Sequence, residues 1–470
     1  MKRTNPAVST AAGAGWAWYA VGILLLAYIF SIMDRQILTL LVGPIQASLG
    51  VNDTQIGLLH GFTFAAFYAV MGLPIARMID RGNRPAIIAT GIALWSLATA
   101  ASGLATDFWH LVAARTGVAV GEAVLIPGAV SLLADLFAPE RRGRAMGILG
   151  TGGPVGAGLG LLAGGLLLGL FTVAPPVVPF LGALEPWQAT FIAVGLPGVA
   201  IGLLMLIVPE PRRAGAARGA QAPGVPLSAT IDFLKGNART FTAVMFGTGS
   251  LFLAVYGWTG WAPTYFVREL GWTYPQVGKL LGVILTVAGP VGALGGAWLA
   301  DRGRKRGVAT ANLRVGMLSC VGMAVASTGM VHGGGEAASV AFLALGAVFS
   351  FTVIGVGTVI IQETAPAPMR GQIAALYTAV LNIVGAGLGP VAVGVLTDYV
   401  IGDASAIGTA IVATCVTASL AGLLLFRLGF ASYATTRAAA ENWRAPAPAP
   451  VPVPNEPAAS AVPGAVAAAH

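Results

Sequence analysis

The sequence predicts an all-α, polytopic membrane protein with twelve transmembrane helices arranged as two six-helix bundles. Three observations predict it: the scarcity of charge, the spacing of apolar stretches and an internal repeat. Of the 470 residues, 56% are hydrophobic and 9% are charged, whereas a soluble globular chain carries about 25% charged residues. So little charge does not cover a water-facing surface of this size, which argues against a soluble enzyme.

Apolar stretches long enough to cross a bilayer recur in two sets of six. A helix needs about 20 mainly apolar residues to cross the hydrocarbon layer. In the first half such stretches begin near Tyr19, Ile56, Pro85, Phe108, Gly143 and Trp187. In the second half they begin near Phe241, Pro275, Val308, Ala337, Gly371 and Ala406. We therefore expect one bundle at residues 19–208 and the other at residues 239–430.

The segments outside these bundles have a different composition. Residues 209–238 are rich in Ala, Gly, Pro and Arg, which is typical of a linker. From Ala445 the chain reads APAPAPVPVPNEP, a composition that cannot bury a core. We expect residues 1–18 to form an N-terminal segment and residues 431–470 to form a disordered tail.

The basic residues predict the orientation in the membrane. Most of them fall in loops on one side, together with both termini. The positive-inside rule places that side in the cytoplasm, and we expect the inner (plasma) membrane. Among the opposite loops, only the one between the seventh and eighth spans carries a clear basic residue, Arg268. The net charge of +8 is therefore a topology signal, and we expect no nucleic-acid partner.

No motif for a metal, a disulfide framework or a nucleotide is present. Cys320 and Cys415 both lie in apolar runs and lack zinc-site spacing. No Walker motif occurs, so ATP does not drive this protein directly. We expect no cofactor, no metal, no catalytic residue and hence no enzyme.

The two halves repeat each other. A shift of 221 residues places Gln55, Gly57, Gly61, Asp80, Arg81 and Gly82 on Gln276, Gly278, Gly282, Asp301, Arg302 and Gly303. A shift of 228 residues places Asp135 and Arg142 on Glu363 and Arg370. Parallel repeats of six helices are one plan of secondary transporters, in which the substrate path lies between the halves.

The loop segment ARMIDRGNR and its echo AWLADRGRKR resemble the signature between the second and third spans of the major facilitator superfamily. The first copy departs from the usual pattern at Asn83 and Pro85. The segments SIMDRQILTLLVGPIQASLGVNDTQIGLL, ARTGVAVGEAVLIPGAVSLLADLFAPERRGRAMG and GWTGWAPTYFVRELGW look like the Spinster branch, which includes exporters of sphingolipid and lysophospholipid species. The resemblance implies alternating access, with the first and fourth spans lining the central path.

Four ionisable residues lie inside predicted spans: Asp34 and Arg35 in the first, Arg115 and Glu122 in the fourth. Such residues cost about 2.5 kcal/mol or more at a helix centre, so they persist where they face a cavity or each other. Seven residues are about two helical turns, so Arg115 and Glu122 share a face. Estimated depths place Asp34 and Arg115 at similar height, with Glu122 about 10 Å deeper.

Burial and a neighbouring arginine act on a carboxyl in opposite directions, which suits a group that binds and releases protons. We therefore expect Asp34 and Glu122 to couple protons, and Arg35 and Arg115 to grip an anionic head group. The alternative is a static ion pair, although a buried pair rarely repays its desolvation.

The resemblance also implies latches between neighbouring helices at the cytoplasmic loops, and simple positive-inside charge is the alternative. The latch candidates are Asp80, Arg81, Arg84, Asp135, Arg142, Asp301 and Arg302.

Three further residues are candidates for substrate binding. Trp258 and Trp261, at the outer end of the seventh span, either line an amphiphile's path or belong to an interfacial aromatic belt. His60, in the second span, is either a substrate contact or a packed side chain. Asn52, followed by Gln55, fits a helix-start cap.

The sequence as a whole predicts a monomeric, proton-coupled secondary transporter that exports an amphiphilic, lysolipid- or sphingolipid-like solute. A general multidrug/proton antiporter and an organic-anion importer remain alternatives. An uncoupled channel or a receptor is a further alternative from another class.

Overall fold

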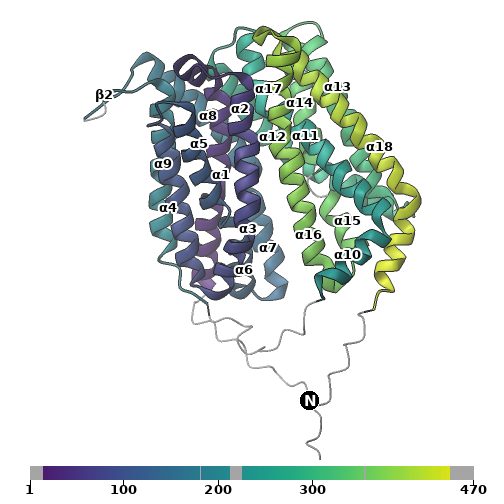
Figure 1. The fold of residues 1–470 in the computed structure, drawn as a ribbon. Coiled ribbons are helices and arrows are strands. Elements are labelled where there is room, and N and C mark those ends of the chain that lie inside the picture. The colour runs from purple at the N-terminus through teal and green to yellow at the C-terminus, as the bar shows by residue number, and fades with distance from the viewer. Residues whose placement is uncertain (1–13, 180–181, 212–224, 354–355, 445–470) are drawn as a thin grey trace, which may run out of the picture.

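Twelve helical segments stand side by side in two groups (Figure 1). The computed structural model describes residues 14–179, 182–211, 225–353 and 356–444. Within these residues, twelve helical stretches are long and apolar enough to cross a membrane. Each begins within a few residues of its predicted start, which confirms the twelve-helix prediction.

The first six spans form the N-terminal half. A two-stranded ribbon of β1 (Val177–Val178) and β2 (Gly182–Ala183) lies between its last two spans. The helices are α1 (Ala14–Leu49), α2 (Asp53–Gly57), η1 (Leu58–Phe62), α3 (Thr63–Arg81), α4 (Arg84–Ser102), α5 (Phe108–Glu122), α6 (Leu125–Leu136), α7 (Pro139–Gly150), α8 (Gly152–Val173) and α9 (Pro186–Met205).

The last six spans form the C-terminal half, and two of its elements are π-helical stretches within the eleventh span. The helices are α11 (Ala238–Arg268), α12 (Tyr274–Lys305), α13 (Ala311–His332), α14 (Glu336–Thr352), α15 (Val356–Thr364), η2 (Ala367–Met369), α16 (Arg370–Val380), η3 (Leu381–Gly387), α17 (Leu388–Val395), η4 (Leu396–Ile401), η5 (Ala404–Ala406) and α18 (Ile407–Glu441).

The predicted end of the second bundle at residue 430 was wrong. Helix α18 continues to Glu441, so the first residues of the predicted tail 431–470 are ordered. Tyr433 and Thr436 stabilise this extension, because both side chains are buried and hydrogen-bonded. The Tyr433 hydroxyl donates to Glu363 at 2.5 Å, and Thr436 Oγ1 lies 2.7 Å from Thr240 Oγ1. The tail from residue 445 lies outside the described residues.

The predicted linker 209–238 contains a helix, α10 (Leu227–Gly236), which the composition did not reveal. Its Phe233 is buried and contacts Phe241 of α11 edge to face. Residues 212–224 of the linker and residues 1–13 of the N-terminal segment lie outside the described residues.

Glycines bring helices from the two halves into direct contact. A Cβ at Gly165 of α8 would lie 3.0 Å from the Cα of Gly278 in α12, and one at Gly57 of α2 would lie 2.7 Å from the Pro390 carbonyl oxygen in α17. Small residues allow this approach inside a membrane.

The predicted cap at Asn52 is confirmed, because its side chain and Gln55 form a capping box at the start of α2.

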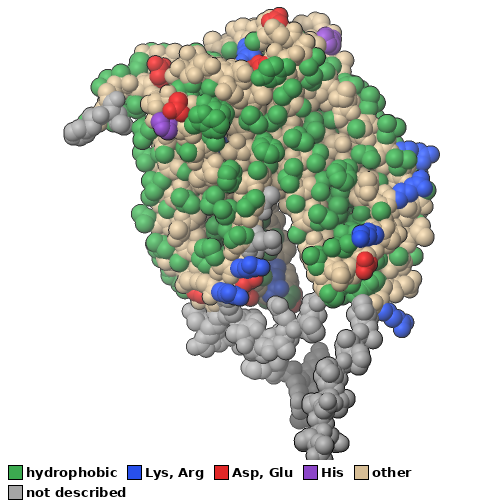
Figure 2. Space-filling view, in the orientation of Figure 1, with side chains coloured by type: hydrophobic (Ala, Val, Ile, Leu, Met, Phe, Trp, Pro, Cys, Tyr) green, Lys and Arg blue, Asp and Glu red, His purple; other side chains and the backbone are tan. Residues whose placement is uncertain are grey.

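The two ends of the molecule differ. We call the end with Arg84 and Arg304 the basic end, and the end with Asp53, Arg268 and Asp398 the closed end. Figure 2 shows a hollow between the two halves that opens toward the basic end. At the closed end, hydrogen bonds join the halves.

Candidate functional site

Two helices carry the four ionisable residues of the centre. Asp34 and Arg35 lie near the middle of α1, and Arg115 lies in α5, which ends at Glu122. The fourth span is interrupted between the end of α5 at Glu122 and the start of α6 at Leu125. Pro127 lies in the first turn of α6, and because proline has no N–H it cannot donate to the Ala123 carbonyl as an unbroken helix would require. The interruption of the fourth span therefore follows directly after Glu122.

The four residues form two ion pairs between α1 and α5. Arg115 Nη1 donates to Asp34 Oδ2 at 3.0 Å, and both side chains are buried. Arg35 donates from Nε and Nη2 to Glu122 Oε2, at 2.7 and 2.5 Å. We call these residues the central cluster. The estimate of similar height for Asp34 and Arg115 agrees with their pairing, whereas the Arg35–Glu122 pair was not foreseen.

Each carboxylate in the central cluster has one oxygen in use and one free. Asp34 Oδ1 and Glu122 Oε1 are buried and have no hydrogen-bond partner among the described residues, and the same holds for Arg115 Nε. An unpartnered carboxylate oxygen inside a membrane is expensive. A proton or a polar group of a solute would satisfy it, so these oxygens are the positions where binding chemistry is expected.

Arg35 is the most accessible member of the central cluster. Its side chain is 31% exposed, whereas that of Glu122 is fully buried. The guanidinium carbon lies 3.8 Å from the ring centroid of Phe64 in α3. A partly exposed cation on an aromatic face combines a site for an anion with an apolar wall.

His60 lies between the two halves. It belongs to the π-helical stretch η1, and a Cβ at Gly260 of α11 would lie 3.6 Å from its ring. The stretch η1 also contacts α1 and α5, the two helices that carry the central cluster. The structure therefore places His60 near the central cluster and against the C-terminal half.

Trp258 and Trp261 are packed between helices of the C-terminal half, and each is about 1% exposed. Trp261 Nε1 donates to the Pro390 carbonyl at 2.9 Å. Trp258 lies against α14, where a Cβ at Gly346 would come within 2.8 Å of its ring. In this conformation neither indole faces the hollow, and neither forms an exposed aromatic belt.

The latch candidates of the first half separate into two groups. Arg84 is buried and bonds Asp135 at 2.6 Å and Glu210 at 2.7 Å. Glu210 was missed by the sequence reasoning, although it follows the last span of the half directly. Asp80 and Arg81 are exposed at the end of α3 and form no ion pair with a described residue.

The second half repeats this arrangement with other residues. Arg304 bonds Asp301 and, at 3.0 Å, Glu363, which the repeat aligns with Asp135. Arg302 takes no part in these bonds, and its guanidinium lies 5.3 Å from the ring centroid of Trp298 instead. Arg304, three residues after Asp301, is on the same helical face, whereas Arg302 points elsewhere.

Arg142 and its repeat partner Arg370 have the same local contact. Arg142 Nε donates to the Phe137 carbonyl at 2.9 Å, and Arg370 Nε donates to the Ala365 carbonyl at 3.2 Å. Each guanidinium therefore caps the end of the preceding helix, five residues back.

The closed end contains a network that the sequence reasoning missed. Arg268 of α11 donates to both carboxylate oxygens of Asp53, at 2.8 and 2.7 Å, and to Gln46 at 2.6 Å. Asp398 accepts from Thr54 N and Oγ1 at 2.7 and 2.6 Å. Each bond joins the two halves. The signal that pointed to it was the isolation of Arg268 among loops poor in basic residues.

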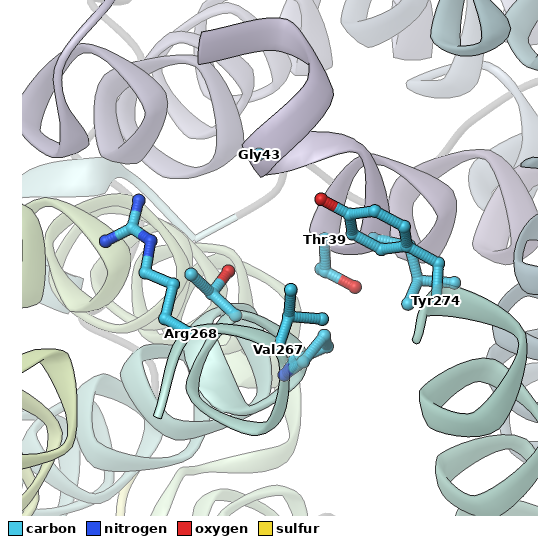
Figure 3. A pocket seen from close by; sticks show the side chains of 8 residues that line it. Thr39, Gly43, Val267, Arg268 and Tyr274 are labelled. Atoms are coloured by element: carbon cyan, nitrogen blue, oxygen red, sulfur yellow. The ribbon is translucent and has the colours of Figure 1, made fainter. Parts of the chain in front are cut away.

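A cavity of about 70 Å³ lies beside this network, between α1, α11 and α12. Figure 3 shows Tyr274 with its hydroxyl directed toward α1 near Gly43, and Arg268 across the cavity. A Cβ at Gly43 would lie 2.5 Å from the Tyr274 hydroxyl oxygen, so a larger residue there would displace the Tyr274 side chain. The Tyr274 ring thus packs directly against the backbone of α1.

No group of three or more His, Cys, Asp or Glu side chains among the described residues is arranged to hold a metal ion. The central cluster itself combines two cations with two anions.

Comparisons with known proteins agree with this architecture. A sequence profile described as the Major Facilitator Superfamily matches residues 24–390. An MFS-type efflux pump of Mycolicibacterium smegmatis is 29% identical over 432 residues, which cover 89% of this chain and 93% of that protein. Protein spinster homolog 1 of Rattus norvegicus is 35% identical over 274 residues, which cover 54% of this chain and 47% of that protein.

Among solved structures, one match is a bacterial homologue of the human lysosomal transporter Spinster in an inward-facing, unoccupied conformation. The TM-score is 0.71 at 23% identity, and the match covers 91% of this chain and 98% of that one. At this identity the likeness shows the fold.

Proposed function

The chain belongs to the major facilitator superfamily as a Spinster-like transporter, and from this premise we propose that it couples the movement of an amphiphilic organic solute to protons. The family consists of transporters, so the chain is not an enzyme. The finer proposal concerns the solute, the coupling ion and the direction.

The proton proposal rests above all on one observation: two arginine–carboxylate pairs lie between α1 and α5, and each has a buried carboxylate with one oxygen unpartnered among the described residues. A carboxylate whose arginine is drawn away by a solute is left as an uncompensated buried charge, which is costly. Taking up a proton removes that cost. Asp34 and Glu122 are therefore our proposed proton carriers.

The amphiphile proposal rests on Arg35 and its surroundings. Its guanidinium is accessible and is backed by the Phe64 ring, so an anionic head group would bind it while an apolar tail follows the hydrophobic walls. A lysolipid- or sphingolipid-like solute has this chemistry. Arg115 and His60 complete the site from its buried side.

Export is the proposed direction, and the similarity to an efflux pump supports it. The basic end is the proposed cytoplasmic end, by the positive-inside rule. Both termini then lie in the cytoplasm. We propose that the protein is a monomer in the plasma membrane. A broad multidrug/proton antiporter and an organic-anion importer differ from this proposal in solute range and direction, not in the site.

The test uses purified full-length protein in proteoliposomes with an imposed pH gradient. We expect a fluorescent lysolipid to accumulate against its gradient, and Arg437→Gln, which removes an exposed charge far from the cluster, to behave like the native protein. Accumulation that is indifferent to the pH gradient would rule out proton coupling. Failure of lysolipid alone, with transport of other organic anions, would favour the importer.

Arg115 and Glu122 separate the two roles within the site. Arg115→Ala should weaken solute binding at every pH, since a guanidinium stays charged throughout. Glu122→Gln should flatten the pH dependence of binding, and the double variant should be non-additive because both side chains belong to one cluster. Binding isotherms across about three pH units measure the pH dependence of solute binding in each variant. Identical pH profiles for the native protein and Glu122→Gln would mean that Glu122 is only a static ion-pair partner of Arg35.

A further inference from the structure

A second basic site lies on the outer surface of the C-terminal half, away from the central cluster. The end of α12 and the start of α13 enclose a surface groove of about 350 Å³. Three arginines line it, Arg302, Arg306 and Arg314, with the apolar side chains of Trp298 and Leu318.

The three guanidinium groups have no ion-pair partner in the part of the chain that the structure describes. All three arginines are exposed, and none forms an ion pair with a described carboxylate. Arg302 lies 5.3 Å from the ring centroid of Trp298, and Arg314 lies 6.0 Å from that of Phe430. Like charges gathered in one groove repel, so the arrangement calls for an anion.

The position of the groove identifies the kind of anion. Arg302 lies in the last turn of the span that ends at Lys305, and Arg314 lies in the first turn of the span that begins at Ala311. Both are therefore at the membrane boundary, where phospholipid head groups lie. Trp298 is 58% exposed and Leu318 is 43% exposed, so an apolar wall continues from the arginines into the hydrocarbon.

We propose that this groove binds an anionic phospholipid of the surrounding bilayer, with the phosphate held by Arg302, Arg306 and Arg314 and an acyl chain lying along Trp298 and Leu318. Guanidinium groups bind phosphate oxygens in pairs of parallel hydrogen bonds. Topology alone requires basic residues at this end of the helices but does not require that three of them converge on one groove beside exposed apolar side chains.

The test is a lipid titration of delipidated full-length protein in detergent, read by native mass spectrometry. We expect dioleoyl phosphatidylglycerol to bind at lower concentration than dioleoyl phosphatidylcholine. The double variant Arg306→Gln/Arg314→Gln should lose about 30-fold in affinity for phosphatidylglycerol, since each basic residue near a lipid surface contributes about a factor of five. Affinity for phosphatidylcholine should not change.

Arg141→Gln/Arg437→Gln is the matched control, because it removes the same charge from exposed positions outside the groove. Equal losses in both double variants would overturn the proposal, as would equal binding of the two lipids by the native protein. Displacement of the lipid by millimolar inorganic phosphate would show a site for free anions rather than for lipid. If the double variant does not fold, the single variant Arg306→Glu, just beyond the end of α12, gives the same comparison.

Discussion

The closed end and the basic end use ion pairs in opposite ways. At the closed end the bonds cross between the halves: Arg268 of α11 reaches Asp53 and Gln46, and Asp398 reaches Thr54. These bonds must break before that end opens. They therefore contribute to the stability of the conformation described, and not to that of a conformation open at that end.

At the basic end the bonds stay within each half. Arg84 bonds Asp135 and Glu210 in the first half, and Arg304 bonds Glu363 in the second. Such bonds do not oppose separation of the halves, and the hollow opens at this end (Figure 2). The comparison teaches that the ion pairs of the closed end join the two halves, whereas those of the basic end join helices within one half.

The largest expected effect lies between the two ends, at the central cluster. Asp34→Asn should abolish proton-driven accumulation while solute counterflow and folding persist, because the amide keeps the shape but neither binds nor releases the proton. Transport into proteoliposomes with and without a pH gradient measures this. A variant that still accumulates solute against its gradient would show that Asp34 is not the coupling site.

Arg268→Gln should break the closed end. The variant leaves Asp53 buried without its cation, which we expect to cost about 2–3 kcal/mol, so the population open at that end should rise about 30- to 160-fold relative to the closed one. Spin-label distances across the closed end measure this shift, with Arg437→Gln as the exposed-charge control. Unchanged distance distributions would mean that helix packing alone holds the end closed.

Arg84→Gln and Arg304→Gln, at the basic end, should lower the free energy of unfolding without changing the distance between the halves. Arg84 is buried with two carboxylates, so its loss should cost about 2–3 kcal/mol, whereas Arg304 is about two-fifths exposed and should cost about 1 kcal/mol or less. Thermal melts give the stability and spin-label distances give the arrangement. A large shift in the distances would contradict bonds that act only within a half.

The smallest effect concerns Glu269, next to Arg268 at the closed end. Burial raises the pKa of Glu269 above 4.5, while its bond from the Gly408 N–H at 2.6 Å opposes the rise. The folded state thus binds this proton more tightly than the unfolded state, so stability falls as pH rises from about 4.5 through the folded pKa. Because Glu269 is partly solvated, the fall should be about 1–2 °C in melting temperature.

Glu269→Gln serves as the comparison for that pH dependence. The amide oxygen still accepts from the Gly408 N–H but does not titrate. The melting temperature of the variant should therefore not show the fall of about 1–2 °C with rising pH that we assign to Glu269. Equal slopes of melting temperature against pH in the native protein and the variant would contradict the assignment to Glu269.

The sequence by itself determined the features that depend on length, hydrophobicity and repetition. Twelve apolar stretches became twelve spans because the bilayer demands that length. The repeat aligned Asp135 with Glu363, and in the structure each of these carboxylates bonds an arginine of its own half. The four ionisable residues of the centre were also evident, because charge inside an apolar run is costly wherever the helices pack.

Only the tertiary structure decided which of these residues meet. Arg35 and Asp34 are neighbours in α1, yet they bond different residues of α5. Arg268 bonds Asp53, 215 positions away in the chain. Trp261, for which the sequence left a path and an interfacial belt open, is buried and donates to the Pro390 carbonyl. Sequence spacing fixes the face of a helix on which a side chain lies, but the partner opposite depends on how whole helices cross, and that is set by the packing of both halves together.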